Sequence, residues 1–426
     1  MQFTLNKTAV AVCLALSSPF IYANGLAINE QSASGAGTAY AGRASSALDA
    51  STIYGNPAGL SRLQQSEVIL GAAAVKAKVD ISNVSTSKKG THKGDMVPFA
   101  TVPFAYYATP VNEHWAVGVG MYVPFALISD YEKAFQGSDH GLYSKVAVMT
   151  IQPTVSYKFN DHIAVGFGPT INRLDGKLTS TVNTSVMPGQ ADTKVNIKGD
   201  DTAYGFNLGI LVDFNERTAW GITYHSKVDY EITGHTSVAG APAVPVLGNL
   251  NGKYSAKLDL TTPESIDTSI THQLNDQWTI HAGATYTRWS RLESIVAKNK
   301  GMPATTPEQF RNMGESFKWH NTWAYSIGAS YQARPDLVLR AGFALDASPT
   351  TNEHRTVRVP VGNRKILALG AGWTPQPNMT FDIAYAYIRE SKTSVSQTEG
   401  QPLKAPFSAT YRNSAHGLVG QMVYRF

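Results

Sequence analysis

The sequence predicts an all-β protein, namely a transmembrane antiparallel β-barrel of about 14 strands with an N-terminal hatch that plugs its lumen. Three observations support this fold class. From Glu67 onward, about fourteen segments alternate apolar and polar residues. Their connections alternate between short polar turns and long irregular stretches, as in outer-membrane barrels. Only 16% of residues are charged while 10% are aromatic, which is typical of membrane strands rather than of a soluble domain.

Met1 to Ala23 is predicted to be a secretory signal peptide. Lys7 supplies its positive charge, Ala9 to Leu16 its apolar centre, and Ile21-Tyr22-Ala23 a cleavage site. The single cysteine, Cys13, lies inside this segment, so the exported chain has neither a disulfide framework nor a thiol nucleophile. No other window offers the roughly 18 apolar residues of a membrane helix.

Asn24 to Leu63 is rich in Gly, Ala and Ser, and its apolar residues are too scattered to form a core. Small residues allow close packing against surrounding walls. Asn56-Pro57-Ala58-Gly59 predicts a turn, because proline fixes its own φ and restricts the residue before it. We expect a compact insert held inside a larger structure; the alternative is a disordered leader.

Residues 64–426 are predicted to form the barrel. In Tyr143–Phe159, His162–Leu174 and Asn378–Ile388, apolar residues fall on one face and small or polar residues on the other. Because successive side chains of a strand point to opposite faces, one face suits lipid and the other a polar lumen.

Six short turns and seven long connections alternate along the barrel, which gives an even strand count with both termini at the short-turn end. The turns are Pro110–His114, Asn160–His162, Asn215–Arg217, Asn275–Gln277, Ala333–Asp336 and Pro375–Asn378. The long connections are Asn83–Pro98, Ser129–Leu142, Thr179–Asp200, Gly234–Lys253, Lys298–Glu315, Ala347–Gly362 and Thr393–Phe407.

Aromatic residues near the strand ends predict two interfacial girdles. Trp115, Trp220, Trp278 and Trp373 lie near short turns, whereas Trp289, Trp319 and Trp323 lie toward the long loops. The last strand ends on Tyr424 and Phe426. This ending resembles the terminal signature by which barrels are recognised for insertion, so we expect the barrel assembly machinery to be a partner.

The N-terminal segment also carries a family resemblance. The residues that carry it are Asn24-Gly25-Leu26, Asn29-Glu30, Ser34-Gly35, Gly37, Ala39-Tyr40, Gly42 and Asn56-Pro57-Ala58. They resemble the hatch of the long-chain fatty acid transporter family (the FadL and toluene-transport group), whose members are outer-membrane barrels. The resemblance extends over the whole chain in layout and is most specific in the hatch, in Tyr122–Tyr131 and at Phe426. It implies location in the Gram-negative outer membrane and a gating role for Asn24, Gly25, Leu26, Asn56, Pro57 and Ala58.

One strand departs from regular alternation. In Trp115–Tyr131, Gly118, Gly120 and Pro124 remove packing side chains and one backbone donor. Proline in a paired strand marks an edge, a bulge or a kink. The family has a kinked strand beside a gap in the wall at a similar position, so the resemblance makes these three residues lateral-gate candidates. The alternative is a loop that begins at Pro124.

Four apolar residues are exceptions on the predicted lumen face: Val146, Val148, Leu211 and Ile388. They are ligand-pocket candidates, and ordinary packing against the hatch is the equal alternative. Lys88-Lys89 with His92-Lys93, and Arg355, Arg358, Arg364 and Lys365, form loose basic clusters. Lipopolysaccharide phosphates are a candidate partner for them, and solvated loop charge is the alternative.

No catalytic or metal-binding motif is found. The chain has no G-x-S-x-G, H-E-x-x-H or Walker sequence, and its eleven histidines lack metal-ligand spacing. We therefore expect no enzyme, no cofactor, no metal and, for an exported chain, no nucleic-acid partner.

By resemblance, the expected function is passive transport of hydrophobic compounds, most of all long-chain fatty acids, through a monomeric plugged barrel with a lateral opening. The alternatives are an aromatic-hydrocarbon channel on the same fold, a polar-solute porin, and a barrel enzyme or surface adhesin.

Overall fold

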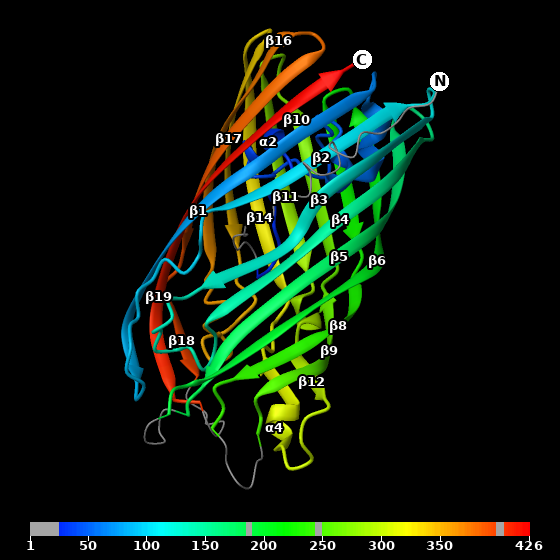
Figure 1. Cartoon of the computed structure of the whole chain (residues 1–426). Coiled ribbons are helices and arrows are strands. Elements are labelled where there is room, and N and C mark those ends of the chain that lie inside the picture. Colours follow the sequence, from blue (N-terminus) through cyan, green and yellow to red (C-terminus); the bar gives the residue numbers. More distant parts are fainter. Residues whose placement is uncertain (1–24, 185–189, 243–248, 398–403) are drawn as a thin grey trace.

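A computed structural model describes residues 25–184, 190–242, 249–397 and 404–426. Antiparallel strands close into a tall barrel around a small helical N-terminal segment (Figure 1). The predicted signal peptide and Asn24 lie outside the described residues. Among the described residues, no helix is both long and apolar enough to cross a membrane.

The described part of the wall contains nineteen strand segments. They are β1 (Glu67–Thr86), β2 (Ala100–Pro110), β3 (Trp115–Asp130), β4 (Tyr143–Lys158), β5 (Ile163–Val182), β6 (Thr193–Asn215), β7 (Thr218–His225), β8 (Val228–Ala239), β9 (Gly252–Thr262), β10 (Ser265–Gln273), β11 (Trp278–Thr287), β12 (Ser294–Lys300), β13 (Asn312–Ser316), β14 (Thr322–Arg334), β15 (Leu337–Asp346), β16 (Arg364–Gln376), β17 (Met379–Glu390), β18 (Thr393–Gln397) and β19 (Phe407–Arg425).

Five consecutive pairs of these segments continue one another, so the closed barrel has fourteen strands, as predicted. The pairs are β7 with β8, β9 with β10, β11 with β12, β13 with β14, and β17 with β18. The last strand closes the barrel against the first, in a register that runs from Glu67 opposite Arg425 to Thr86 opposite Phe407.

The predicted short turns are confirmed, and four share one device. The side-chain oxygens of Asn112, Asn160, Asn215 and Asn275 each accept the backbone N–H two residues later at 2.9 Å, which fixes a tight turn. The predicted long connections are too long in several places. β5 continues to Val182 and β6 begins at Thr193, inside the stretch expected to be a loop.

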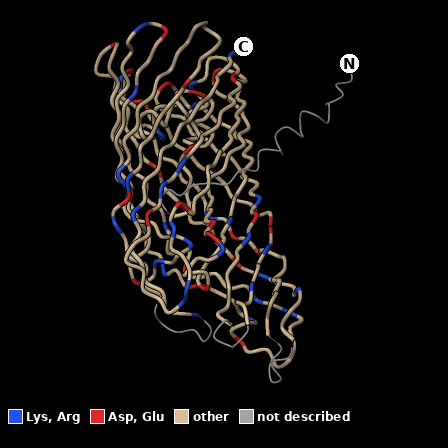
Figure 2. Tube along the Cα trace, turned by 60° about the vertical axis from the view of Figure 1, so that its left-hand side comes forward, with Lys and Arg blue, Asp and Glu red and all other residues tan. Residues whose placement is uncertain are grey.

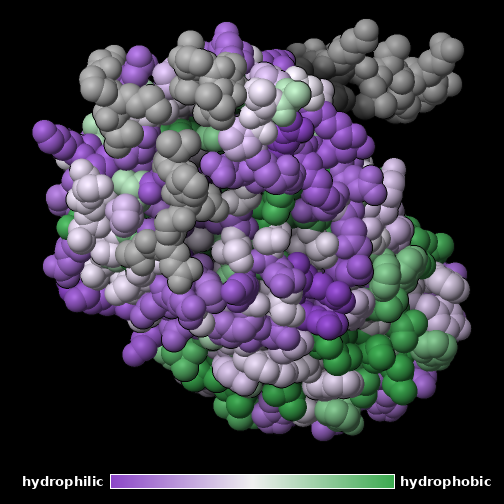
Figure 3. Space-filling model, turned by 90° about the horizontal axis from the view of Figure 1, so that it is seen from below, coloured by the Kyte–Doolittle hydropathy of each residue, from purple (hydrophilic) through white to green (hydrophobic). Residues whose placement is uncertain are grey.

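The outer face of the wall is apolar on its short-turn half. Exposed residues there include Leu70, Val119, Ile151, Phe167, Leu369 and Ile383. Figure 2 shows few charges on this part of the wall and many toward the loop end. The loop end itself is mostly hydrophilic (Figure 3). The exposed Trp115, Trp278 and Trp373 border the short turns, as the girdle prediction requires.

The hatch, here residues 25–63 of the described chain, packs inside the barrel. It contains the short helices α2 (Ala33–Ala36) and α3 (Thr52–Gly55) and the 3-10 turn η1 (Pro57–Arg62). Two further short elements, η2 (Trp289–Arg291) and α4 (Glu308–Arg311), lie between wall strands. Buried Ile28, Ile53 and Leu60 of the hatch share a core cluster with Ile69 and Phe104 of the wall.

Candidate functional site

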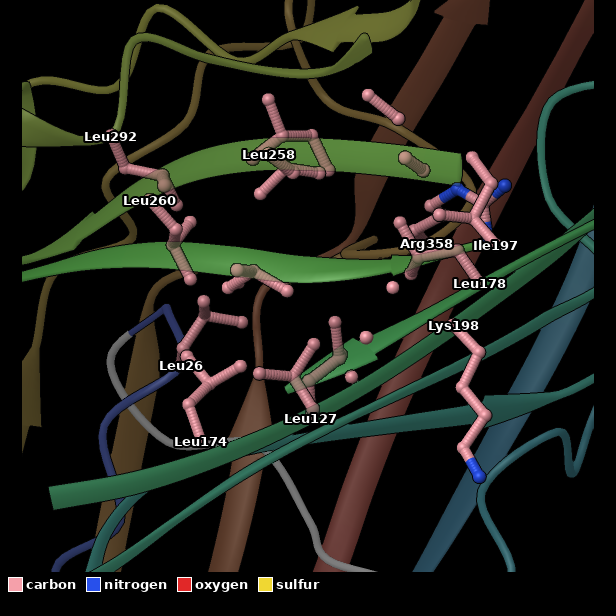
Figure 4. A pocket seen from close by; sticks show the side chains of 18 of the residues that line it. Leu26, Leu127, Leu174, Leu178, Ile197, Lys198, Leu258, Leu260, Leu292 and Arg358 are labelled. Atoms are coloured by element: carbon pink, nitrogen blue, oxygen red, sulfur yellow. The ribbon is translucent and has the colours of Figure 1, made fainter. Parts of the chain in front are cut away.

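An apolar cavity of about 790 Å³ lies inside the barrel toward the loop end. We call it the chamber. Leu26 of the hatch, Leu127 and Leu174 line one side, and Leu258, Leu260 and Leu292 line the other (Figure 4). Apart from Lys198, Lys257 and Arg358, its lining residues are apolar or glycine. The chamber therefore suits an apolar group.

A second cavity, of about 820 Å³, adjoins the chamber, and we call it the mouth. The two share Leu178, Ile197, Leu258, Ile295 and Arg358 as lining residues. The mouth adds charged and polar groups, including Asp139, His140, Glu315 and Lys404. An apolar compartment thus continues directly into a charged one.

Arg358 lies where the two cavities meet. Its Nη1 donates to the Tyr143 carbonyl at 3.0 Å and to the Ser144 hydroxyl at 2.9 Å, and its Nε lies 3.3 Å from a Glu315 carboxylate oxygen. It thereby joins the connection before β16 to β4 on one side and to β13 on the other. Because the charge is desolvated but well hydrogen-bonded, removing any partner would be costly.

Lys404 supplies a second cation at the mouth. Among the described residues, no carboxylate lies within ion-pairing distance of its ammonium group. Burial lowers the pKa of Lys404, and the nearby Glu315 carboxylate partly offsets the shift. A half-buried ammonium without a close counter-ion favours an incoming anion.

His140, whose ring bonds to the residue after Lys404, is neutral at pH 7. Burial lowers its pKa to about 4, although its Nε2 lies 2.8 Å from the Ala405 carbonyl oxygen and the resulting hydrogen bond opposes the shift. This hydrogen bond ties the β3–β4 connection to the chain before β19.

The end of the hatch forms part of the chamber lining. Gly25 has φ +64°, and a Cβ there would lie 2.9 Å from the rings of both Trp289 and Trp319. The prediction that these two tryptophans belong to an outer girdle is wrong, because both are buried inside the barrel. Their rings instead contact Gly25, next to Leu26.

The wall changes beside this end of the hatch. Tyr122 pairs with Thr150 and Phe125 with Val148, so β3 carries one extra residue, a bulge, at Val123-Pro124. Pairing of β3 with β2 stops at Met121 opposite Ala105. The Ala100–Phe104 part of β2 pairs only with β1 among the described strands.

The hatch occupies the edge of β3 that β2 leaves. The Ile28 N–H donates to the Pro124 carbonyl at 2.8 Å, and the Ala126 N–H donates to the Leu26 carbonyl at 2.9 Å. Of the three predicted lateral-gate residues, Pro124 lies in the bulge, whereas Gly118 and Gly120 lie on its short-turn side. A Cβ on either glycine would crowd Ile53 of the hatch.

Asn56, Pro57 and Ala58 fix the other end of the hatch. The Asn56 side chain donates to the Ala44 carbonyl at 2.7 Å and to the Ile210 carbonyl of β6 at 3.0 Å, and it accepts from the Ala58 N–H at 3.0 Å. The Ser156 hydroxyl of β4 donates to the Ala58 carbonyl at 3.0 Å. These buried contacts tie the hatch backbone to the wall.

Glycines of the wall let the hatch approach this closely. A Cβ at any of six positions would crowd hatch backbone, and at a seventh, Gly209, it would crowd the side chains of Asn56 and Pro57. The six are Gly166, Gly221, Gly283, Gly328, Gly342 and Gly370. The lumen face of the wall is therefore shaped to the hatch.

Several charged residues of the hatch bond to charged or polar residues of the wall. Arg43 lies 3.4 Å from Asp267, and its Nη2 donates to Asn29 at 2.7 Å. Arg62 pairs with Asp213. Asp49 accepts from Gln421 at 2.9 Å, and Gln421 also donates to Asp382, the partner of Arg340. The lumen charges thus serve to hold the hatch.

The four predicted pocket residues lie in different places. Val146 lines the chamber, and Val148 belongs to the buried cluster next to it. Leu211 packs against Ala58 of the hatch. Ile388 lines another cavity, of about 840 Å³, between the hatch and strands β11, β14 to β17 and β19.

Most of the chamber lining comes from strands on the loop side of the barrel. Ile232, Leu258, Leu260 and Ile295 lie on β8, β9 and β12. Leu258 and Leu260 alternate with the charged Lys257 and Asp259. This alternation is the sequence signal that would have indicated these two leucines as inward-facing. Arg355, Arg358 and Arg364, expected as a loop cluster, are buried, so they form no exposed basic patch.

No metal-ligand cluster of at least three His, Cys, Asp or Glu side chains occurs within the described ranges.

Comparison with known proteins places the chain among outer-membrane transport proteins. The family model described as "Outer membrane protein transport protein (OMPP1/FadL/TodX)" matches residues 14–426. The chain is 27% identical to outer membrane protein P1 of Haemophilus influenzae, over 96% of both chains. It is 26% identical to the long-chain fatty acid transport protein of Salmonella typhi, over 92% of this chain and 93% of the relative.

A similar solved structure is that of a FadL homologue from Pseudomonas aeruginosa. It has a TM-score of 0.84 and 22% identity, and the match covers 94% of this chain and all of the other. At this identity the likeness shows the fold.

Proposed function

This chain belongs to the OMPP1/FadL/TodX family of outer-membrane transport proteins, and on that premise we propose that its cargo is long-chain fatty acids. As a member of the family, it is an outer-membrane transporter of hydrophobic compounds in a Gram-negative bacterium. The cargo, the route and the gate are the proposal.

The observation that carries the choice of cargo is the junction of chamber and mouth. A long-chain fatty acid has an acyl tail, which gains about 0.8 kcal/mol for each CH₂ removed from water. It also has a carboxylate, which needs a cation once it is desolvated. The apolar chamber suits the tail, and Lys404 with Arg358 suits the carboxylate. A neutral aromatic hydrocarbon would leave these cations unused.

The proposed route leads sideways out of the barrel. The hatch fills the lumen between the chamber and the short-turn end. Its packed side chains close a straight path to that end. The lost pairing between β2 and β3 supports an exit into the bilayer at the Val123-Pro124 bulge. Movement by diffusion through this opening keeps an acyl chain out of water.

Leu26 provides a physical link between cargo and exit. Its side chain lines the chamber, while its carbonyl accepts from Ala126 on the edge of β3. Cargo that displaces Leu26 would also remove the segment that occupies the edge of β3. We propose that this movement, together with that of Asn24 and Gly25, opens the route.

Binding of matched ligands tests the cargo. The variant Lys404→Met keeps the length of the side chain and removes its charge. We expect it to weaken binding of a fluorescent long-chain fatty acid about tenfold while leaving the corresponding fatty alcohol unaffected, because only the acid carries the charge. Equal effects on acid and alcohol, or tighter binding of toluene than of either, would contradict the proposal.

A crosslink tests the route. One cysteine is placed on Ala100–Phe104 of β2 and one on Tyr122–Ala126 of β3, and both are oxidised in the cysteine-free exported chain. Fatty-acid uptake by cells that lack another transporter should stop on oxidation and return on reduction. Uptake that persists in the fully crosslinked protein would refute the lateral route.

A polar-solute porin is the second candidate, and conductance distinguishes it. A porin conducts ions as it stands, whereas a plugged barrel conducts only after deletion of residues 24–63. The barrel assembly machinery and lipopolysaccharide remain the proposed partners in the membrane, and a monomer the proposed form.

A further inference from the structure

A cluster of cations lies on the outer face of β16, β17, β19 and β1, away from the chamber. Its members are Lys365, Arg389, Arg412, Lys76 and Lys78, all exposed to the outside of the barrel. Their neighbours Arg364, Ile388 and Val79 point inward and are buried. We call these five residues the basic patch.

The pairing register sets the members of the basic patch side by side. Lys365 is directly opposite Arg389, Arg389 is opposite Ser414, and Ser414 is opposite Lys78. Arg412 is opposite Asp80, and the Lys78 ammonium lies 3.8 Å from the Asp80 carboxylate. Like charges directly opposite on neighbouring strands destabilise a sheet.

Several other exposed cations of the outer wall have a carboxylate partner, although Lys177 and Lys198, which face each other on β5 and β6, form no ion pair among the described residues. Arg173 on β5 pairs with Asp200 on β6, Lys227 lies 2.6 Å from Asp229, and Lys298 lies 3.4 Å from Asp259. Within the described chain, Lys365, Arg389, Arg412 and Lys76 form no ion pair. Most of the positive charge of the basic patch therefore has no counter-charge among the described residues.

The basic patch lies where the apolar wall ends. On the short-turn side of Lys365 and Arg389, the outward residues are Leu367, Leu369, Tyr385 and Ile383. The Tyr385 hydroxyl and the His416 ring nitrogen are 2.7 Å apart, as befits polar groups at the edge of the hydrocarbon. Aromatic residues mark this boundary in membrane barrels. The cations thus lie at headgroup depth on the loop side, which is the outer leaflet.

We propose that the basic patch binds the phosphate groups of a phosphorylated glycolipid of the outer leaflet, with Lys365 and Arg389 holding one phosphate between them. A phosphate between two facing cations replaces their repulsion with two charge-assisted hydrogen bonds. Clusters of Lys and Arg at headgroup depth attract anionic lipids in the same way. The proposal rests on the outer-membrane location and not on the cargo.

Lipid binding to the intact purified protein tests it. Native mass spectrometry in detergent counts bound lipid A that carries both phosphates, and the same lipid A after enzymatic dephosphorylation is the second probe. The double variant Lys365→Gln, Arg389→Gln should weaken binding of the phosphorylated lipid about thirtyfold. Lys365→Arg, which keeps the charge, should bind like the parent.

Arg173→Gln with Lys227→Gln is the matched control, because it removes two exposed cations from another face. Folding of every variant is checked by its heat-dependent mobility on a gel. The proposal is overturned if the control weakens binding as much, if dephosphorylated lipid binds equally well, or if millimolar inorganic phosphate alone displaces the lipid. Fatty-acid binding is measured in parallel and should not change, which separates this inference from the proposed function.

Discussion

Replacing Asn56 with alanine would loosen the hatch at a buried point where one side chain makes three hydrogen bonds. The substitution removes two donated bonds and one accepted bond from a side chain that is 1% exposed. The Ala44 carbonyl and the Ala58 N–H would then be buried without that partner. Each such group costs about 1–3 kcal/mol. We therefore expect the seated hatch to lose about 3 kcal/mol, or about a hundredfold in its equilibrium with a displaced hatch.

Single-channel recording in planar bilayers measures this equilibrium, because a displaced hatch leaves an aqueous path that conducts ions. Asn56→Ala should show openings about a hundredfold more often than the parent. Asn160→Ala is the control, since Asn160 also accepts backbone N–H groups but lies in an exposed turn. A folded Asn56→Ala barrel that stays as closed as the parent would refute the reasoning that these bonds seat the hatch.

Three further predictions follow from the geometry. Gly221→Val would place a Cβ against the Ala44 carbonyl and should make residues 25–63 accessible to protease. Gly420→Val is the control, because a Cβ there would meet no atom within 4 Å. Equal protease resistance of the two variants would contradict the close fit of the hatch to the wall. His140 has a folded-state pKa of about 4, below its unfolded value, so its contribution to loop stability is full above about pH 6.5 and is lost, by at most about 3 kcal/mol, as the pH falls toward 4. The hydrogen-exchange protection factors of residues 131–142 should therefore fall at pH 4.5 in the parent but not in His140→Gln, and protection that does not change with pH in the parent would argue against it. Deleting Phe426 removes its two backbone hydrogen bonds with Ser66 at the barrel seam, so the folded fraction in the outer membrane should fall severalfold, while unchanged assembly would show that the seam forms without them.

The barrel could be predicted from sequence because lipid imposes a strict period of two on every strand. Asn112, Asn160, Asn215 and Asn275 marked turns that the structure confirms. The loops were predicted too long because the outer parts of β5 and β6 lie beyond the apolar band, where both faces carry polar residues and the alternation fades.

The site was harder to predict than the wall. Trp289 and Trp319 are of the residue type, and lie at the positions, expected for an aromatic girdle. Only the three-dimensional fold shows that they pack on Gly25. Arg358 resembled a loop cation, because its partners Tyr143, Ser144 and Glu315 lie far away in sequence. Contacts between distant segments leave no periodic signal in a single chain.

The split strands have a consequence for how this protein can vary. β8, β9, β12 and β13 pair with one another in series and join the rest of the wall through β6, while β7, β10, β11 and β14 form the tier beneath them. The upper tier supplies much of the lining around the cargo, and the lower tier carries the surface that faces lipid. Substitutions in β8, β9, β12 and β13 can therefore reshape the chamber for a longer or bulkier cargo. They need not change how β7, β10, β11 and β14 contact the bilayer.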